Sequence, residues 1–237
     1  ERDESSGFLT LRTSMGDDPR ELIRSVAESF PSVASALVHV PRSIADTGRQ
    51  YATPTFVDDT VVLVPAWQPA PDASQPVFIE PLDTFGLGNH PTTVLALRLA
   101  LRHVREGSTV FDLGSGSGVL AVGLAKFRGC TVMAYDIAES AHDALLLNAQ
   151  RNEVTTVAWR QGIEGTVSHC VVANILAPVL IAESQNISHA VEDHGFVILS
   201  GMRDEQVEAV TVHFDEFAVV DSESMDGWTA VALQKAT

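Results

Sequence analysis

The pattern of hydrophobic and polar positions changes character near residue 90. From there to about residue 213, short apolar runs alternate with segments whose apolar residues recur at helical spacing. The predicted strands are residues 109–113, 131–136, 154–159, 170–174 and 196–200. The predicted helices are residues 92–104, 118–127, 140–152, 178–190 and 204–213. Strands that alternate with helices in this way predict a parallel sheet with helices on both faces.

Two further apolar runs close the chain, residues 217–221 and 228–234, with only a glycine-containing turn between them. A connection this short predicts an antiparallel hairpin, because a parallel crossover needs a dozen or more residues. We therefore expect an α/β fold with a doubly wound, Rossmann-like, seven-stranded sheet that ends in a C-terminal antiparallel hairpin. NAD-binding folds more often end with all strands parallel.

The first 76 residues carry a different pattern. Residues 8–13 alternate as a half-buried strand does, a helix is predicted from Asp17 to about Phe30, and strands are predicted near residues 36–40 and 60–64. Residues 67–76 contain three prolines and are predicted to form a linker. We expect a small α+β N-terminal extension with its linker over residues 1–76, followed by the main domain over residues 77–237.

Composition narrows the classes of partner. The chain has 237 residues, of which 45% are hydrophobic, and a formal net charge of −16. Such a negative surface repels phosphate backbones and argues against nucleic acid as a partner, whereas it could attract a cationic substrate or serve only solubility. No apolar run approaches the roughly 18 residues that a membrane span needs. We expect no membrane partner.

The two cysteines, Cys130 and Cys170, each lie in an apolar run, and no Cys/His cluster with metal-ligand spacing is present in the sequence. We expect two core thiols, no metal site and a reducing compartment, the cytoplasm.

The sharpest local signal is Asp112-Leu113-Gly114-Ser115-Gly116-Ser117-Gly118, which leaves a predicted strand and enters a predicted helix. Glycines allow a ligand to approach the backbone closely. Asp136 ends the next predicted strand, where a carboxylate can accept hydrogen bonds from both hydroxyls of a ribose. The loop and this carboxylate together predict a site for an adenosine-containing cofactor, rather than a structural turn alone.

The identity of that cofactor depends on Asp112. Residues 116–121 also satisfy the dinucleotide pattern GxGxxA. A carboxylate at position 112 would repel a pyrophosphate, whereas S-adenosylmethionine (SAM) has no phosphate and carries an ammonium that this carboxylate could attract. The residues favour SAM over NAD, with Gly114, Gly116 and Gly118 cradling the cofactor.

Three segments, in order along the chain, resemble the PrmA family of ribosomal protein methyltransferases. They are Phe85-Gly86-Leu87-Gly88-Asn89-His90-Pro91-Thr92-Thr93, the glycine loop, and Val171-Val172-Ala173-Asn174-Ile175-Leu176-Ala177. The resemblance extends from about residue 56 to the C-terminus and implies a class I SAM-dependent methyltransferase. It implies SAM contacts at Thr93, Gly114, Asp136 and Asn174. It also implies that Asn174 aligns the acceptor nitrogen on the methyl group.

Other residues near these motifs are weaker candidates. His90 is the candidate general base, although a histidine before proline is more often a helix cap or a packing residue. Phe85, Leu87 and Trp67 are candidates for the wall of the substrate pocket, and core packing is the alternative for the two aromatic residues.

Two departures from the family bear on the acceptor. The N-terminal portion is short, and Leu87 replaces the threonine of the family's FGTG motif. We therefore expect methyl transfer to a nitrogen of a small-molecule amine or an amino-acid-like biosynthetic intermediate. A protein lysine or N-terminal amine is the alternative. An NAD-dependent oxidoreductase, a SAM enzyme that transfers another group, and a catalytically silent SAM-binding module remain further alternatives. Homodimerisation stays open.

Overall fold

The computed structural model describes residues 2–3, 10–11, 52–72 and 74–236. The chain divides into two compact units, residues 1–50 and residues 51–237. In the first unit, β1 (Arg2–Asp3) pairs antiparallel with β2 (Thr10–Leu11), which lies within the strand predicted over residues 8–13. The predicted helix at residues 17–30 and the predicted strand at residues 36–40 lie outside the described residues.

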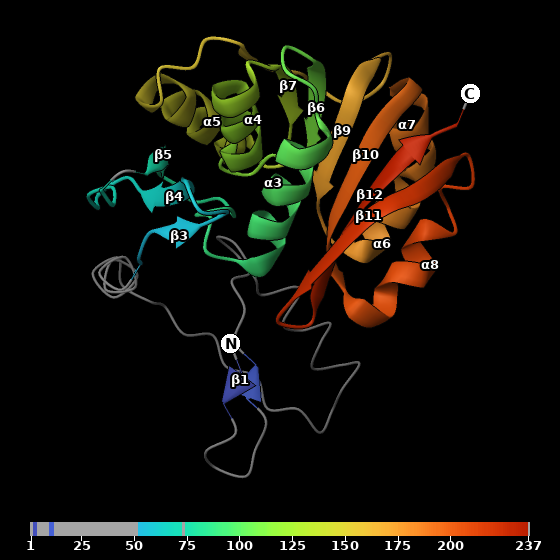
Figure 1. Cartoon of the computed structure of the whole chain (residues 1–237), viewed down its shortest axis with the longest axis horizontal. Coiled ribbons are helices and arrows are strands. Elements are labelled where there is room, and N and C mark those ends of the chain that lie inside the picture. Colours follow the sequence, from blue (N-terminus) through green and yellow to red (C-terminus); the bar gives the residue numbers. More distant parts are fainter. Residues whose placement is uncertain (1, 4–9, 12–51, 73, 237) are drawn as a thin grey trace. The chain divides into compact units, whose positions relative to one another are not determined.

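The second unit contains the predicted seven-stranded sheet, with the strand order β11-β12-β10-β9-β6-β7-β8 (Figure 1). Its strands are β6 (Thr109–Leu113), β7 (Thr131–Tyr135), β8 (Val157–Trp159), β9 (Ser168–Asn174), β10 (Val191–Arg203), β11 (Phe217–Met225) and β12 (Trp228–Lys235). The pairs among β6 to β10 are parallel, and β12 is antiparallel to both β10 and β11. The predicted fold class, including the C-terminal hairpin, is confirmed.

Helices cover both faces of this sheet. The helices α3 (Pro91–His103), α4 (Val119–Arg128) and α5 (Glu139–Arg151) pack on one face (Figure 1). The short helices α6 (Ala177–Ala182), α7 (Ser184–His189) and α8 (Val207–Thr211) pack on the other. Successive strand residues point to opposite faces, so Val110 belongs to one buried cluster and Phe111 to the other. This alternation is what makes the sheet the centre of two hydrophobic cores.

Two of the predicted helices differ from the observed ones. The helix predicted over residues 178–190 is broken at Glu183 into α6 and α7, and the Ser184 hydroxyl donates to the carbonyl of Ile181 at the break. Serine competes with the helical backbone for such carbonyls, a local effect that the apolar spacing does not reveal. The helix predicted over residues 204–213 is a 3-10 turn, η1 (Asp204–Gln206), followed by α8.

A small second sheet precedes α3, with the order β3 (Thr55–Phe56), β4 (Val61–Pro65) and β5 (Gln75–Ile79). The prediction missed β5, because Pro76 and the prolines before it suggested a linker. β5 is an edge strand that pairs only with β4 among the described strands, and proline is tolerated at an edge. The domain boundary expected between residues 76 and 77 falls inside this strand.

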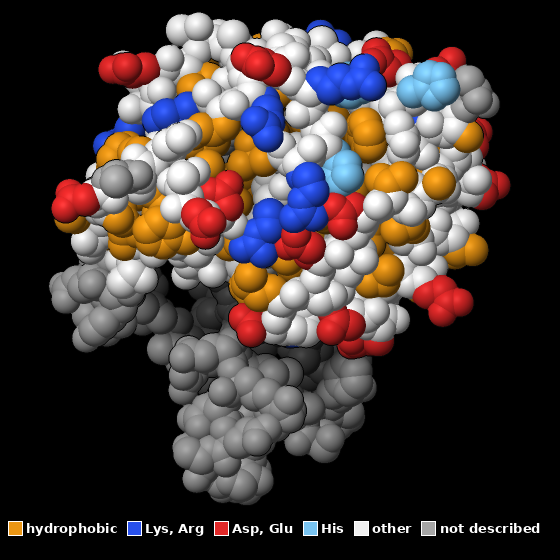
Figure 2. All heavy atoms as spheres, viewed as in Figure 1, with side chains coloured by type: hydrophobic (Ala, Val, Ile, Leu, Met, Phe, Trp, Pro, Cys, Tyr) orange, Lys and Arg blue, Asp and Glu red, His pale blue; other side chains and the backbone are white. Residues whose placement is uncertain are grey.

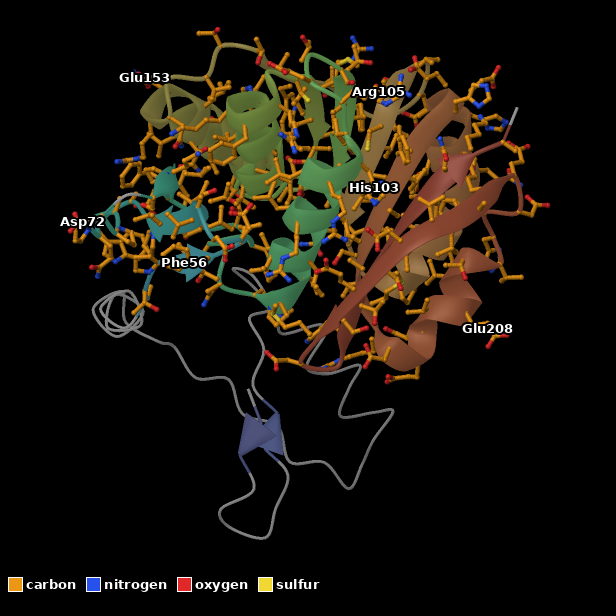
Figure 3. All side chains as sticks on the ribbon, viewed as in Figure 1. Phe56, Asp72, His103, Arg105, Glu153 and Glu208 are labelled. Carbon is orange, nitrogen blue, oxygen red and sulfur yellow. The ribbon has the colours of Figure 1, made fainter. Side chains whose placement is uncertain are left out.

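Polar contacts hold α3 against β11, an edge strand of the large sheet, and against the loop after β3. Arg98 and Arg102 on α3 pair with Glu223 on β11, Arg102 and His103 pair with Asp221, and Arg98 Nε donates to the carbonyl of Val57. Figure 2 shows basic and acidic side chains side by side on this face, and Figure 3 labels His103 on α3. These contacts fix α3, whose first residues enter the candidate site.

Candidate functional site

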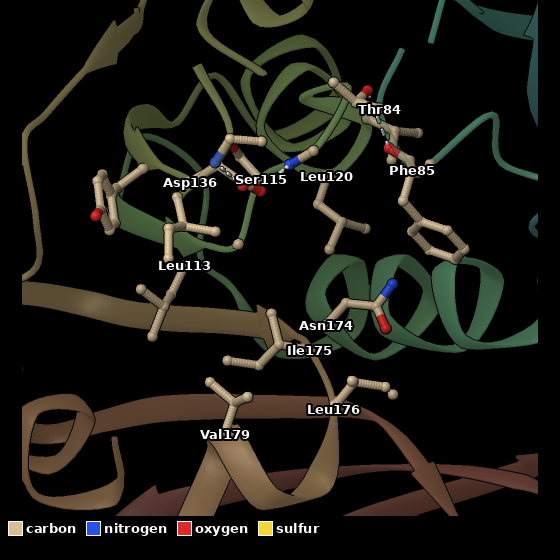
Figure 4. A pocket seen from close by; sticks show the side chains of 18 of the residues that line it. Thr84, Phe85, Leu113, Ser115, Leu120, Asp136, Asn174, Ile175, Leu176 and Val179 are labelled. Carbon is tan, nitrogen blue, oxygen red and sulfur yellow. Dashed lines mark hydrogen bonds between the residues drawn. The ribbon is translucent and has the colours of Figure 1, made fainter. Parts of the chain in front are cut away.

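A cavity of about 780 Å³ opens at the carboxyl ends of β6, β7 and β9. Ligands of open α/β sheets bind at this edge. Figure 4 shows Asp136 at one end of the cavity and Phe85 at the other, with apolar side chains that include Leu113, Ile175 and Val179 along its length. The cavity gathers Phe85, His90, Thr93, Gly114, Gly116, Asp136 and Asn174 from the residues that the sequence singled out.

The glycine loop reaches the cavity with its own N–H groups already used. Each N–H from residue 114 to residue 118 donates within the protein: Gly114 and Ser115 to the carbonyl of Tyr135 (2.8 and 3.1 Å), Gly116 to Asp136 Oδ2 (2.8 Å), Ser117 to the carbonyl of Phe85 (2.9 Å) and Gly118 to the carbonyl of Ser115 (2.7 Å). A dinucleotide site presents such N–H groups to phosphate oxygens. The loop is therefore arranged for a cofactor without a pyrophosphate.

Gly116 has no space for a side chain. A Cβ atom there would lie 2.5 Å from the carbonyl oxygen of Phe85, and its φ of +51° is in the left-handed region. The loop can therefore pack directly on the backbone of residue 85, which brings the two motifs together at the cavity.

Asp112 lies beneath the loop and does not line the cavity, and neither does Gly118. The Asp112 side chain is fully buried: its Oδ2 accepts from the N–H of Ala121 at 3.1 Å, while its Oδ1 has no hydrogen-bond partner. Burial raises the pKa of Asp112 to about 7, and nearby Asp136 adds to the rise. Because Asp112 does not line the cavity, its attraction of a cofactor ammonium, directly or through water, stays a prediction.

Asp136 follows β7 and faces the cavity as predicted. Its Oδ2 accepts from the N–H of Gly116 and its Oδ1 accepts from the N–H of Ala138 at 2.9 Å. A carboxylate oxygen has two lone pairs, so each oxygen keeps one acceptor position for a further donor. The side chain is held in place by backbone on both sides and can accept from a pair of hydroxyl groups.

Thr93 and Asn174 meet at the floor of the cavity, although 81 positions separate them in sequence. Thr93 is fully buried in the first turn of α3, and Asn174 ends β9. Nδ2 of Asn174 donates to Thr93 Oγ1 at 3.4 Å. This hydrogen bond orients the amide and leaves Asn174 Oδ1 as an acceptor at the cavity.

His90 is the N-cap residue of α3, and its Nδ1 accepts from the N–H of Thr92 at 3.3 Å and lies 2.8 Å from Thr92 Oγ1. Burial lowers the pKa of His90, and nearby Arg203 lowers it further. In a neutral ring whose Nδ1 accepts, Nε2 carries the hydrogen. This geometry favours the capping role over that of a general base, because neither ring nitrogen is then free to take a proton.

The ring of His90 lies between two aromatic side chains. The ring centroid of Phe85 is 5.5 Å away and that of Trp228 is 5.0 Å away, both in edge-on geometry. The guanidinium of Arg203 lies 3.9 Å from the centroid of Trp228. Phe85, His90 and Trp228 together form what we call the aromatic end of the cavity.

Trp228 lines the cavity although the sequence did not single it out, and two residues predicted for the wall lie elsewhere. Trp228 begins β12, and the start of an antiparallel strand lies at the same edge as the ends of its parallel neighbours, a signal that was available once the hairpin was predicted. Leu87 packs against the buried cluster on the α3 face and does not line the cavity. Trp67 follows β4 in the small sheet and does not line it either.

The carboxylates among the lining residues make the wall of the cavity acidic. Asp83, Asp136, Glu164 and Glu183 are among the lining residues, and no lysine or arginine is. The rim is apolar, with large exposed side chains at Phe85, Ile137, Leu176 and Val179. No metal-binding group of His, Cys, Asp and Glu residues and no helix long and apolar enough to cross a membrane occur in the described part of the chain.

Comparison with known proteins identifies the family. Residues 25–236 match the model of the family described as ribosomal protein L11 methyltransferase (PrmA). This chain belongs to the PrmA family. The resemblance predicted from the FGLGNHPTT segment, the glycine loop and the ANILA segment is confirmed, as are the predicted enzyme class and cofactor of the family, class I methyltransferases that use SAM.

Individual members of the PrmA family are also similar to this chain. The ribosomal protein L11 methyltransferase of Bacillus cytotoxicus is 30% identical over 203 residues, which are 81% of this chain and 65% of that one, and that of Bacillus cereus matches equally. The chain therefore spans slightly less than two thirds of the length of these relatives. The crystal structure of the ribosomal protein L11 methylase from Lactobacillus delbrueckii is 26% identical and covers 78% of this chain and all of the other, with a TM-score of 0.71.

The cavity fits the SAM of the PrmA family. A loop without spare N–H groups suits a cofactor without phosphates, and the Asp136 carboxylate retains acceptor positions for ribose hydroxyls. The buried hydroxyl of Ser115, which lines the cavity, has no partner within the protein and can bond to a ligand there.

Proposed function

We propose that this chain is a SAM-dependent methyltransferase that acts on an amino group of a protein, a lysine side chain or an N-terminal amine. The observation that carries the cofactor assignment is the glycine loop, whose five N–H groups are used internally beside a carboxylate that keeps acceptor positions. The sequence favoured a small-molecule amine as the acceptor. The relatives named above do not support that preference, because each is named for a ribosomal protein.

The charges and apolar rim of the cavity support an amine on a larger partner. An ammonium group that enters the cavity meets acidic lining residues, with no lysine or arginine among them, and these carboxylates attract it. The exposed apolar residues at the rim, such as Leu176 and Val179, offer a surface to the groups that surround the amine. A ribosomal protein as acceptor would place the reaction in the cytoplasm.

The residues act by positioning and by excluding water. Asp136 would hold the ribose hydroxyls, and SAM supplies a methyl group on a sulfonium for in-line displacement by an amine lone pair. Asn174 Oδ1 would accept a hydrogen bond from the amine and direct its lone pair toward that methyl group. An ammonium must lose its proton to water before it can react, and burial among apolar side chains favours the neutral amine that then attacks.

Two measurements test this proposal. Calorimetric titration of SAM, S-adenosylhomocysteine and NADH should show micromolar binding of the SAM pair only, and Asp136→Ala should abolish it. Labelled SAM should then transfer its methyl group to ribosomal protein L11. Transfer to an extracted pool of small amines, with none to the protein, would return the assignment to the small-molecule acceptor. Binding of NADH without SAM would reject the enzyme class.

A further inference from the structure

Two buried asparagines, Asn148 in α5 and Asn152 at the C-cap of α5, bind the edge of the small sheet in the same way. Asn152 accepts from the N–H of Phe78 at 2.9 Å and donates to the Phe78 carbonyl at 2.8 Å. One turn earlier, Asn148 accepts from the N–H of Glu80 at 2.8 Å and donates to the Glu80 carbonyl at 2.9 Å. Each side-chain amide thus pairs with β5, or with the residue just after it, as a neighbouring strand would. Asn148 and Asn152 are four residues apart in the helix, and their partners Phe78 and Glu80 are two residues apart in extended chain. The two pairs fit because four helical residues and two extended residues cover similar lengths.

Asn148 makes one contact that Asn152 does not. Its second Nδ2 hydrogen goes to the carbonyl of Ser117, in the glycine loop, at 2.9 Å. Both amide hydrogens and the amide oxygen are therefore used, and the side chain has no exposed surface. One buried amide joins α5, the end of β5 and the loop at the candidate cofactor site.

The segment between these contacts forms part of the cavity wall. We call residues 80–86 the strap. Asn148 holds its first residue, while Ser117 holds its last two through N–H donation to the Phe85 carbonyl and hydroxyl donation to the Gly86 carbonyl at 2.6 Å. Residues 83–86 of the strap line the cavity. Both ends of the strap are tied to Ser117, directly or through Asn148.

We propose that Asn148 is a positioning residue for the cofactor, holding the strap and the glycine loop in one arrangement. This inference rests on the proposed function. Without the amide, the carbonyls of Glu80 and Ser117 each lose a buried donor, and the two walls can shift independently. Partners within one hydrogen-bond network are strongly coupled. Loss of Asn148 therefore disturbs cofactor affinity, beyond the stability that any buried asparagine of α5 supplies.

Asn152→Ala is the matched control, because it removes an equivalent pair of bonds to β5 and a third bond, to the backbone carbonyl of Asn148, but none to the loop. We expect both Asn148→Ala and Asn152→Ala to lower Tm by several degrees. By calorimetry at a temperature where both variants are folded, Asn148→Ala should weaken S-adenosylhomocysteine binding about tenfold, and Asn152→Ala less than threefold. Hydrogen exchange should rise at residues 114–118 in the first variant only.

A second variant covers the outcome in which Asn148→Ala fails to fold. Ser117→Ala keeps the backbone carbonyl at position 117 but removes the hydroxyl bond at the other end of the strap. It should weaken S-adenosylhomocysteine binding about threefold and speed amide hydrogen exchange at residues 80–86. Equal affinities for the two asparagine variants, or a Ser117→Ala variant unchanged in both measurements, would overturn the inference. Wild-type protein that binds no S-adenosylhomocysteine would instead overturn the proposed function.

Discussion

The two ends of the cavity are built in different ways. The loop end comprises Gly114, Ser115, Gly116 and Asp136, all from one strand-loop-helix-strand passage of the chain. The aromatic end joins Phe85 and His90 to Trp228, which arrives from the opposite end of the second unit. The loop end makes its own hydrogen bonds, while the aromatic end depends on the packing of distant elements. Loss of a loop-end residue should therefore affect the cofactor, and loss of residues toward the aromatic end should affect the acceptor or the reaction.

The largest effect is expected at Gly116. Gly116→Ala places a Cβ atom 2.5 Å from the Phe85 carbonyl oxygen, a backbone atom that cannot move without the strap. We expect a loss of S-adenosylhomocysteine affinity of at least about 1000-fold, roughly 4 kcal/mol, measured by calorimetry. Gly165→Ala is the control, since Gly165 also has a positive φ, +69°, but a Cβ atom there meets nothing within 4 Å. An equal loss in both variants would show that strain in φ, not the clash, is responsible.

The second prediction concerns the protonation of Asp112, the buried carboxyl group beneath the loop end. Its pKa in the folded protein is raised to about 7, above the unfolded value of about 3.9, so its contribution to stability is fully present below pH 4 and is lost as pH rises to about 7. Asp112→Asn should therefore gain stability relative to wild type across that range, by a few kcal/mol. Urea unfolding at several pH values, without cofactor, measures the gain. A difference independent of pH would contradict the burial argument.

Asn174 lies between the two ends, and its substitution should lower the rate of reaction without weakening cofactor binding. Asn174→Ala removes the acceptor oxygen proposed to orient the amine and leaves Asp136 and the loop untouched. We expect kcat to fall about 10- to 100-fold. The dissociation constant of S-adenosylhomocysteine should change less than about threefold. If affinity falls as far as kcat does, Asn174 belongs with the loop end instead.

The smallest effect is expected at His90. Asparagine is a good N-cap residue, so His90→Asn retains a cap for α3 while it removes the imidazole from the aromatic end of the cavity. We expect kcat within about threefold of wild type, because neither ring nitrogen is free to accept a proton. A loss of 100-fold with unchanged cofactor affinity would restore the general-base hypothesis.

The contrast between the two ends also explains what the sequence could predict. Gly114, Gly116 and Asp136 follow from a local rule, in which a strand ends in a glycine loop and the next strand ends in a carboxylate. Trp228 needs the position of β12 in the sheet, and Asn148 needs the path of β5, which Pro76 disguised. The break between α6 and α7 coincides with a serine hydroxyl that bonds to a helical carbonyl, a contact that apolar spacing does not reveal. Local patterns therefore predict the candidate cofactor site, whereas contacts between distant elements determine its far wall.

The position of β12 has a consequence for synthesis on the ribosome. It is the last described strand in chain order, yet it lies inside the sheet, between β10 and β11. Until its residues have left the ribosomal exit tunnel, β10 presents an open edge and Trp228 is missing from the cavity. Chains fold from the N-terminus as they emerge, and unpaired edges favour aggregation. The nascent protein would thus pass through a stage with an exposed strand, and it would acquire its complete cavity only after almost the whole of this sequence has been translated.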